Sequence, residues 1–156
     1  MIALEWKAIA PGEGRGEGRA LLARMYRAHR GCEMPGIVPE ERGKPRFVED
    51  STCFSISHTK RHVFCAISDR PIGIDAEETD RDIDLRLADK ILSEEEKTRW
   101  LKTSDKREAL LRLWVLKEAA AKCTGEGLRG YPNKTDFSPE DPRLMEIDGC
   151  FVAVIE

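Results

Sequence analysis

The stretch PIGIDAEET, residues 71–79, alternates apolar or small side chains with polar ones, as a half-buried β-strand does. Ile72 and Ile74 fall on one face of an extended chain, whereas Asp75 and Glu77 fall on the other. Alternate residues of a strand are about 6.5–7 Å apart, so the two carboxylates are neighbours. Such a face is either the solvated side of an edge strand or one half of a site.

Other strands are predicted on both sides of this stretch. TCFSISH (52–58) and HVFCAIS (62–68) are rich in β-forming residues, and the short polar link between them suits a hairpin. With residues 71–77 they predict an antiparallel meander of three strands. Residues 2–9 predict another strand, and MEIDGCFVAVIE (145–156) predicts a hairpin that turns at its Asp-Gly pair.

Helices are predicted before and after this central region. ALLARMYRAH (20–29) has the apolar spacing of an amphipathic helix, and we expect GEGRGEGR (12–19) to be a flexible lead into it. Ser93, with a glutamate three residues later, is the signature of a capping box. DKREALLRLWVLKEAAAKCTG (105–125) predicts the longest helix, capped by its first Asp or by Ser104 and stopped by its final Gly.

Composition narrows the class of protein. A chain of 156 residues, 40% hydrophobic and 35% charged, can form one ordinary domain or two small lobes. It has no apolar run near the roughly 18–20 residues of a membrane span and no apolar signal segment, so we expect a cytoplasmic protein without membrane contact. The net charge of −3 argues against nucleic-acid binding. Five scattered cysteines without a CxxC pair predict reduced thiols, not a disulfide framework or a structural zinc site.

The long predicted helix contributes a polar stripe. Trp114, Glu118 and Lys122 follow one another at i,i+4 spacing, which an ordinary exposed ion pair would also explain. Together with Asp75 and Glu77, however, Glu118 supplies three hard oxygen ligands. Three carboxylates suit Mg²⁺, which keeps water ligands and completes its shell with substrate phosphates. A phosphate-containing ligand is therefore predicted.

Basic and hydroxyl side chains are available for such a phosphate. The candidates are Lys44, Ser57, His58 and Lys122. The glycine-rich GEGRGEGR lacks the lysine of a phosphate-binding P-loop, and no serine-hydrolase or zinc-hydrolase motif is present. The sequence therefore favours metal-assisted phosphate chemistry over nucleophilic hydrolysis.

Five motifs, taken in order and spacing, resemble the 4'-phosphopantetheinyl transferases. They are GKP (43–45), FSISHT (54–59), PIGIDAEE (71–78), LWVLKEAAAK (113–122) and GEGL (125–128). The chain is more similar to the two-lobed type that activates carrier domains of synthetases than to the small trimeric holo-acyl-carrier-protein synthases. The resemblance covers about residues 43–128, roughly half of the chain.

The resemblance implies an α+β fold, a pseudo-dimer of two small lobes in which each helix packs on an antiparallel sheet. We place the N-terminal lobe at residues 1–78 and the C-terminal lobe at residues 79–156, with the site at the seam between them. We expect a monomer, and sheet edges exposed by the short lobes leave self-association as the alternative.

The resemblance also implies a reaction. A serine of an acidic acyl or peptidyl carrier protein attacks the β-phosphate of coenzyme A, receives phosphopantetheine and releases adenosine 3',5'-bisphosphate. Asp75, Glu77 and Glu118 would hold Mg²⁺, and Lys122 would add positive charge at the reacting phosphates. Glu118 is our preferred general base, with Asp75 or a water molecule on the metal as alternatives.

The remaining implied roles concern coenzyme A. Ser57, His58 and Lys44, together with Lys122, would contact the coenzyme, and Arg19 would replace part of a basic segment that this chain lacks. One rival is a non-catalytic module that binds coenzyme A or a carrier protein, and another is different Mg²⁺-dependent chemistry on a nucleotide pyrophosphate. A non-catalytic binding module would have no physical reason to keep three mutually repelling acids together.

Overall fold

The computed structural model describes residues 1–39, 43–127 and 134–156. Within these ranges the strands are β1 (Ala3–Ala8), β2 (Ile37–Pro39), β3 (Pro45–Phe47), β4 (Cys53–His58), β5 (His62–Ser68), β6 (Gly73–Glu78), β7 (Leu144–Ile147) and β8 (Cys150–Ile155). The α-helices are α1 (Gly14–Arg30), α2 (Ala88–Ile91), α3 (Glu94–Leu101) and α4 (Lys106–Thr124), and a short 3₁₀ helix, Leu85–Leu87, precedes α2.

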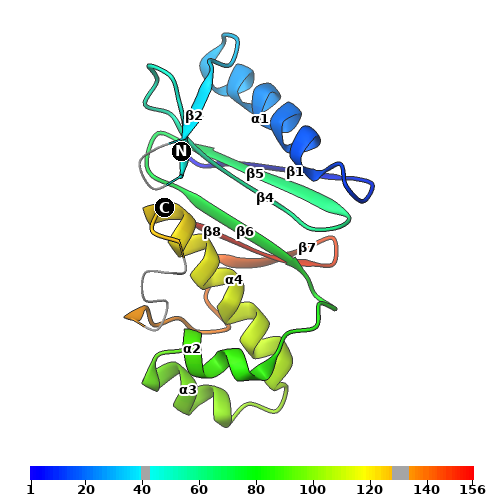
Figure 1. The fold of residues 1–156 in the computed structure, drawn as a ribbon, viewed down its shortest axis with the longest axis vertical. Coiled ribbons are helices and arrows are strands. Elements are labelled where there is room, and N and C mark those ends of the chain that lie inside the picture. The colour runs from blue at the N-terminus through cyan, green and yellow to red at the C-terminus, as the bar shows by residue number, and fades with distance from the viewer. Residues whose placement is uncertain (40–42, 128–133) are drawn as a thin grey trace.

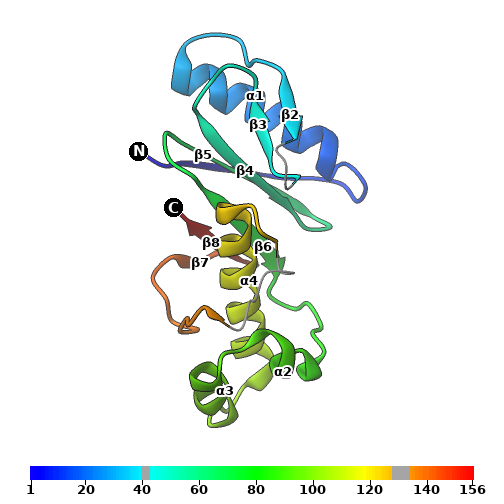
Figure 2. The ribbon, with the colours of Figure 1, turned by 60° about the vertical axis from the view of Figure 1, so that its left-hand side comes forward.

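The strands form two three-stranded antiparallel sheets, with the orders β1-β5-β4 and β6-β8-β7, and a small β2-β3 ladder. Figure 1 shows α1 at one end of the molecule and α2 and α3 at the other, with the two larger sheets between them. The turned view of Figure 2 keeps this arrangement. The mixed architecture of antiparallel sheets and helices agrees with the predicted α+β class.

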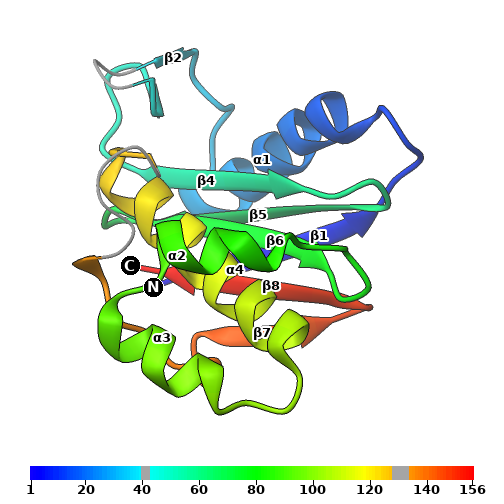
Figure 3. The same cartoon turned by 60° about the horizontal axis from the view of Figure 1, so that its bottom comes forward.

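Strand alternation divides the apolar core into three parts. On β5, Val63 and Cys65 face α1, whereas Phe64 and Ala66 face the second sheet. On β8, Phe151 packs on the side of the second sheet that faces α4, whereas Cys150 and Val152 pack between the two sheets. The order of layers is therefore α1, first sheet, second sheet, α4. Figure 3 shows α2, α3 and α4 in front of the second sheet.

The predicted three-stranded meander is wrong. β6 does not pair with β5, because β5 already hydrogen-bonds to β1 along one edge and to β4 along the other. A strand has only two edges, so the chain after Ser68 crosses to the second sheet, where β6 pairs with β8. The N-terminal strand, which is distant in sequence, takes the place that the meander would have given to residues 71–77.

The expected flexible lead before the first helix is also wrong. α1 begins at Gly14, so most of GEGRGEGR is helical. Gly14 and Gly18 are buried, and a Cβ atom at Gly14 would lie 2.6 Å from the ring of His58, while one at Gly18 would lie 3.0 Å from Ile56. These glycines allow the first turns of α1 to approach β4 closely, which offsets their low helix propensity.

Two contacts hold the sheets and α4 together around β6. The backbone N–H groups of Ile74 and Ala76 donate hydrogen bonds to the hydroxyls of Ser55 and Ser57 on β4, at 3.0 and 3.1 Å. Gly73 allows α4 to pack directly on the strand, since a Cβ atom there would lie 2.0 Å from a backbone oxygen of the helix. β4 of the first sheet and α4 therefore both reach β6.

The division into lobes at 78/79 stays a prediction. β6 belongs to the second sheet by its hydrogen bonds, so a boundary drawn by sheet membership would fall between Ser68 and Gly73. Each of the two larger sheets carries a helix, α1 on the first and α4 on the second.

The local signals for helix ends and the final hairpin are confirmed. Ser93 and Glu96 form a capping box, Asp105 accepts a hydrogen bond from the N–H of Glu108, and Gly125 ends α4 in the left-handed conformation. The β7-β8 hairpin turns at an Asp-Gly pair in which both residues have positive φ. No helix in the described ranges is long and apolar enough to cross a membrane.

Candidate functional site

Asp75 lies at the centre of the candidate site, on the face of β6 that meets α4. Its side chain is buried, and its Oδ1 atom accepts hydrogen bonds from Lys122 Nζ of α4 at 2.8 Å and from Ser57 Oγ of β4 at 3.3 Å. Its other oxygen, Oδ2, is buried and has no hydrogen-bond partner among the described residues. A buried carboxylate oxygen without a partner is costly, so this atom is suited to bind a cation or a donor from a ligand.

The three predicted acids influence one another electrostatically. Burial is the largest cause that raises the pKa of Asp75, and Lys122 opposes it. Burial, and to a smaller extent the charge of Asp75, also raises the pKa of Glu77, while Arg81 lowers it. For Glu118, burial followed by the charges of Asp75 and Glu77 raises the pKa from its ordinary 4.5 to about 7. The acids therefore share one weakly solvated region, in which the charged form of each is disfavoured.

The structure brings these acids near one another without closing them into a compact ligand set. Glu77 forms an ion pair with Arg81, and the side chain of Trp114, like Arg81, lowers the pKa of Glu77. A different group of three possible metal ligands is more compact in the described part of the chain. It consists of His62, Glu78 and Cys150, whose donor atoms all lie within 4.8 Å of one another. The role of the three acids as Mg²⁺ ligands therefore stays a prediction.

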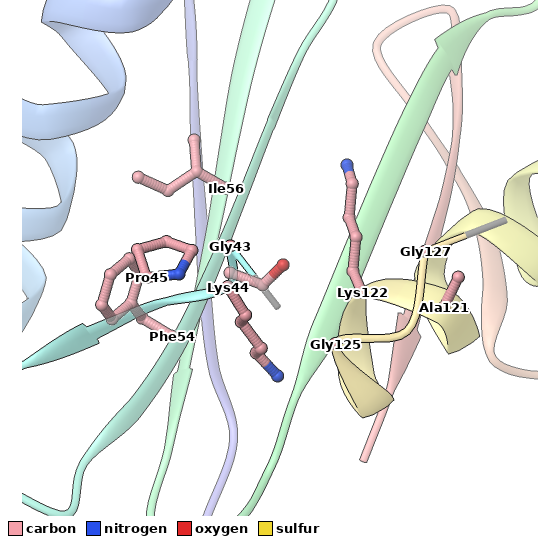
Figure 4. Close-up of a pocket in the computed structure, with 10 residues that line it drawn as sticks. Gly43, Lys44, Pro45, Phe54, Ile56, Ala121, Lys122, Gly125 and Gly127 are labelled. Carbon is pink, nitrogen blue, oxygen red and sulfur yellow. The ribbon is translucent and has the colours of Figure 1, made fainter. Parts of the chain in front are cut away.

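A pocket opens beside Asp75, between β4 and the C-terminal end of α4. Its volume is about 310 Å³. Its lining residues are Gly43, Lys44, Pro45, Phe54, Ser55, Ile56, Ala121, Lys122, Gly125 and Gly127. Figure 4 shows the apolar side chains of Pro45, Phe54 and Ile56 on one side, the end of α4 with Lys122 on the other, and Lys44 between them. Two lysines thus meet an otherwise largely apolar hollow.

Lys44 joins the GKP segment to the end of α4. Its ammonium group donates hydrogen bonds to the backbone oxygens of Cys123 at 2.7 Å and Ile72 at 3.3 Å. A positive charge at a helix C-terminus is favourable because the last carbonyl groups have no partner within the helix. An ammonium group has three N–H donors, so these two hydrogen bonds leave capacity for a phosphate oxygen.

The other residues predicted to contact coenzyme A are Ser57, His58 and Arg19, and they differ in their position relative to the pocket. Ser57 bonds directly to Asp75, whereas His58 lies exposed at the end of β4, against Gly14 of α1. Arg19 is exposed in the second turn of α1, and neither it nor His58 lines the pocket in the described part of the chain. The structure therefore groups Lys44, Ser57 and Lys122 and leaves Arg19 and His58 apart from them.

Sequence reasoning missed two contributors to the site. Arg81 forms an ion pair with Glu77, which lies four residues earlier in the chain. The sequence shows this i,i+4 spacing, but Arg81 lies after the end of β6 and not in a helix. Ser55 lines the pocket and accepts the hydrogen bond from β6, and only the side-by-side placement of β4 and β6 reveals this. Leu128, the last residue of the GEGL motif, lies outside the described residues.

Comparison with known proteins gives a family match for the C-terminal half of the chain. Residues 71–148, half of the chain, match the family model of the 4'-phosphopantetheinyl transferase superfamily. This segment contains Asp75, Glu77, Glu118 and Lys122, which are the acids of the site and the lysine that binds Asp75.

Individual relatives extend the similarity to the N-terminal side. The 4'-phosphopantetheinyl transferase HetI of Nostoc sp. (strain PCC 7120) is 36% identical over 141 residues, which are 83% of this chain and 59% of HetI. The 4'-phosphopantetheinyl transferase Sfp of Bacillus subtilis is 38% identical over 114 residues, which are 70% of this chain and 49% of Sfp. The transferase gsp of Aneurinibacillus migulanus is 37% identical over 91 residues, 56% of this chain and 37% of that protein.

The matched regions thus span between 37% and 59% of the lengths of these relatives. The family match nevertheless covers half of the chain and includes both halves of the candidate site, the acidic strand and the Glu-Lys stripe of α4. The chain belongs to the 4'-phosphopantetheinyl transferase superfamily.

Proposed function

We propose that this protein transfers 4'-phosphopantetheine from coenzyme A to a serine of an acyl or peptidyl carrier protein, with Mg²⁺, and releases adenosine 3',5'-bisphosphate. The observation that carries the proposal is the position of the acidic cluster beside a lysine-lined pocket. Asp75 binds Lys122, and Lys122 also lines the pocket in which a phosphate-bearing ligand can lie.

The donor atoms of the cluster fit Mg²⁺. Asp75, Glu77 and Glu118 offer only oxygen ligands, which a hard cation prefers, and Asp75 Oδ2 is buried without a partner. Binding of a cation would relieve the repulsion that contributes to the raised pKa values of Glu77 and Glu118. When bound, Mg²⁺ would neutralise charge on the pyrophosphate of coenzyme A.

Basic side chains of the chain would bind the other phosphate oxygens. Lys122 has an exposed fraction of 34%, so its ammonium group can reach a ligand while it stays close to Asp75. Lys44 lines the same pocket, and Ser57, His58 and Arg19 are the further coenzyme contacts that we propose. Coenzyme A extends well beyond a pocket of about 310 Å³, so contacts outside it are needed for the rest of the molecule.

Glu118 is the proposed general base. A pKa of about 7 places its proton uptake near neutral pH, where a base works efficiently, although a bound cation would lower that value. Glu118 would take the proton of the carrier serine as the serine oxygen forms its bond to the β-phosphorus. The bond between that phosphorus and the bridging oxygen breaks, and its electrons leave with adenosine 3',5'-bisphosphate. Asp75 is the alternative base.

The partner and setting are further parts of the proposal. We propose an acidic carrier protein as acceptor, a monomeric enzyme with self-association as the alternative, and a cytoplasmic location.

Mass spectrometry of an apo carrier protein incubated with coenzyme A and Mg²⁺ tests the proposal. We expect the carrier to gain the mass of one phosphopantetheine group, and we expect Glu118→Gln to slow the transfer strongly. Glu108→Gln, on the first turn of the same helix, is the matched control and should transfer at the normal rate. Binding of coenzyme A without any mass gain would instead identify a non-catalytic binding module, and a normal rate for Glu118→Gln would move the base to Asp75.

A further inference from the structure

A second cluster of possible ligands lies on the opposite face of β6. It combines a histidine, a cysteine and a glutamate from three strands, His62 of β5, Cys150 of β8 and Glu78 of β6. His62 Nδ1 is 3.3 Å from Cys150 Sγ and 3.6 Å from Glu78 Oε1. Cys150 and Glu78 are direct cross-strand partners, whereas His62 reaches them from the other sheet.

The two distances from His62 to the other ligands match those around a tetrahedral zinc ion, and all three donor atoms lie within 4.8 Å of one another. Zinc bonds of about 2.3 Å to sulfur and about 2.0–2.1 Å to nitrogen and oxygen separate the sulfur and nitrogen ligands by about 3.5 Å and the nitrogen and oxygen ligands by about 3.3 Å. The observed separations of 3.3 and 3.6 Å differ from these by only a few tenths of an ångström. We propose that His62, Glu78 and Cys150 bind a zinc ion that links the two sheets.

Neighbouring side chains orient two of the three ligands, His62 and Glu78. His62 Nε2 is 2.8 Å from Asp148 Oδ2, and when this nitrogen carries the proton and donates it, Nδ1 presents its lone pair to Cys150 and Glu78. A carboxylate on the second nitrogen is the usual support for a metal-binding histidine. Glu78 is held through Oε1 by the Thr59 hydroxyl at 2.6 Å and through Oε2 by Arg61 at 2.7 Å. The Asp-Gly turn of the β7-β8 hairpin places Asp148 two residues before Cys150.

The cluster is enclosed but can be reached. Cys150 is fully buried, which excludes it as a nucleophile towards a substrate, and His62 is 6% exposed. A hollow of about 580 Å³ adjoins it, lined in part by His62, Glu78 and Asp148. A metal ion can enter from this side, and a water molecule from the hollow can fill the fourth position. Binding releases the thiol proton of Cys150 to solvent as the sulfur–zinc bond forms.

This site differs in chemistry from the acidic cluster around Asp75. Alternate residues of β6 point to opposite faces, so Asp75 and Glu77 face α4 and Glu78 faces the space between the sheets. Sulfur and imidazole ligands favour zinc, whereas the all-oxygen cluster favours Mg²⁺. Because zinc would bridge His62 of one sheet to two strands of the other, it would stabilise the contact between the sheets.

Titration of the whole purified chain with Co²⁺, a spectroscopic substitute for zinc, tests the proposal. We expect one equivalent to bind with a thiolate-to-cobalt charge-transfer band and the strong visible absorption of tetrahedral cobalt, and excess Mg²⁺ to leave both unchanged. Cys150→Ser should abolish the charge-transfer band. Cys65→Ser removes an equally buried thiol, and Cys32→Ser removes an exposed one, so both should keep the band.

Absence of the band from the wild-type protein would overturn the proposal, as would a band that survives Cys150→Ser. Asp148→Asn provides a test that does not remove a buried group, since the Asp148 side chain is 57% exposed. It should weaken the affinity for Co²⁺ about 10- to 100-fold. Unchanged affinity would contradict the geometry proposed for His62. None of these readouts uses phosphopantetheine transfer, so failure of the zinc site and failure of the proposed activity are distinguishable.

Discussion

Replacement of Glu118 by glutamine should make the protein more stable at alkaline pH and leave its stability unchanged at acidic pH. The pKa of Glu118 is raised in the folded chain from 4.5 to about 7, by burial and by the charges of Asp75 and Glu77. Below pH 4.5 the group is protonated in both the folded and the unfolded chain, so its full contribution to stability is present. As the pH rises towards about 7, the unfolded chain loses its proton first, and folding becomes less favourable.

The size of the effect follows from the two pKa values. Each pKa unit corresponds to about 1.4 kcal/mol, so the difference between 4.5 and about 7 sets an upper limit of about 3 kcal/mol at alkaline pH. Because Glu118 is only half-buried, solvent screens part of this effect, and we expect roughly 2 kcal/mol. Glutamine has a similar shape and carries no charge, so the variant should avoid this loss.

Urea unfolding, followed by circular dichroism at a series of pH values in the presence of a chelator, measures the difference. We expect the free energies of unfolding of the variant and the wild type to coincide near pH ~4.5 and to separate progressively up to pH ~8. Added Mg²⁺ should stabilise the wild type more than the variant. Glu108→Gln on the same helix should follow the wild-type curve. A pH-independent difference, or a variant that is less stable at pH ~8, would refute the electrostatic reasoning.

Three further changes test the packing and the ion pairs. Gly73→Ala would place a Cβ atom 2.0 Å from a backbone oxygen of α4, so thermal unfolding should show a loss of roughly 1–3 kcal/mol. Glu96→Gln removes the charge that pairs with the buried ammonium of Lys117 at 2.7 Å, and urea unfolding should show a loss of about 3–5 kcal/mol. Lys122→Met removes the partner of buried Asp75 and should destabilise the protein by roughly 1–3 kcal/mol, less than a fully buried pair because the Lys122 side chain is 34% exposed. Because burial raises the pKa of Asp75, this loss should shrink as the pH falls and Asp75 gains a proton.

Two of these changes, Gly73→Ala and Glu96→Gln, have a control variant of the same residue type. Gly16→Ala lies in α1, where a Cβ atom would meet nothing within 4 Å, and it should stabilise the helix by about 0.5–1 kcal/mol. Glu95→Gln alters an exposed acid beside Glu96 and should change stability by less than about 0.5 kcal/mol. Equal losses for Glu95→Gln and Glu96→Gln would show that the buried ion pair has no special role, and a constant loss for Lys122→Met across pH would contradict its coupling to Asp75.

Local patterns in the sequence predicted most of the elements that hold the candidate site. Alternation along residues 71–79 separated the face of Asp75 from the apolar face of β6, and capping signals at Ser93, Asp105 and Gly125 were confirmed. These features depend on residues within a few positions of one another, so the chain specifies them before it folds. The family also followed from motifs that lie in order along the chain, and the comparisons confirm it.

Contacts between residues distant in the sequence decided where α1 begins, which sheet β6 joins and which side chains meet at the site. The start of α1 depends on Gly14 and Gly18 fitting against β4, and β6 joined the second sheet because β5 had no free edge. The contact of Lys122 with Asp75 joins residues 47 positions apart, and the pairing of His62 with Cys150 joins residues 88 apart. Local sequence determined the identity and face of each side chain. The packing of α4 on β6, and of one sheet on the other, decided which distant side chains meet. Bringing such residues together costs chain entropy, and only the burial of side chains in that packing compensates this cost.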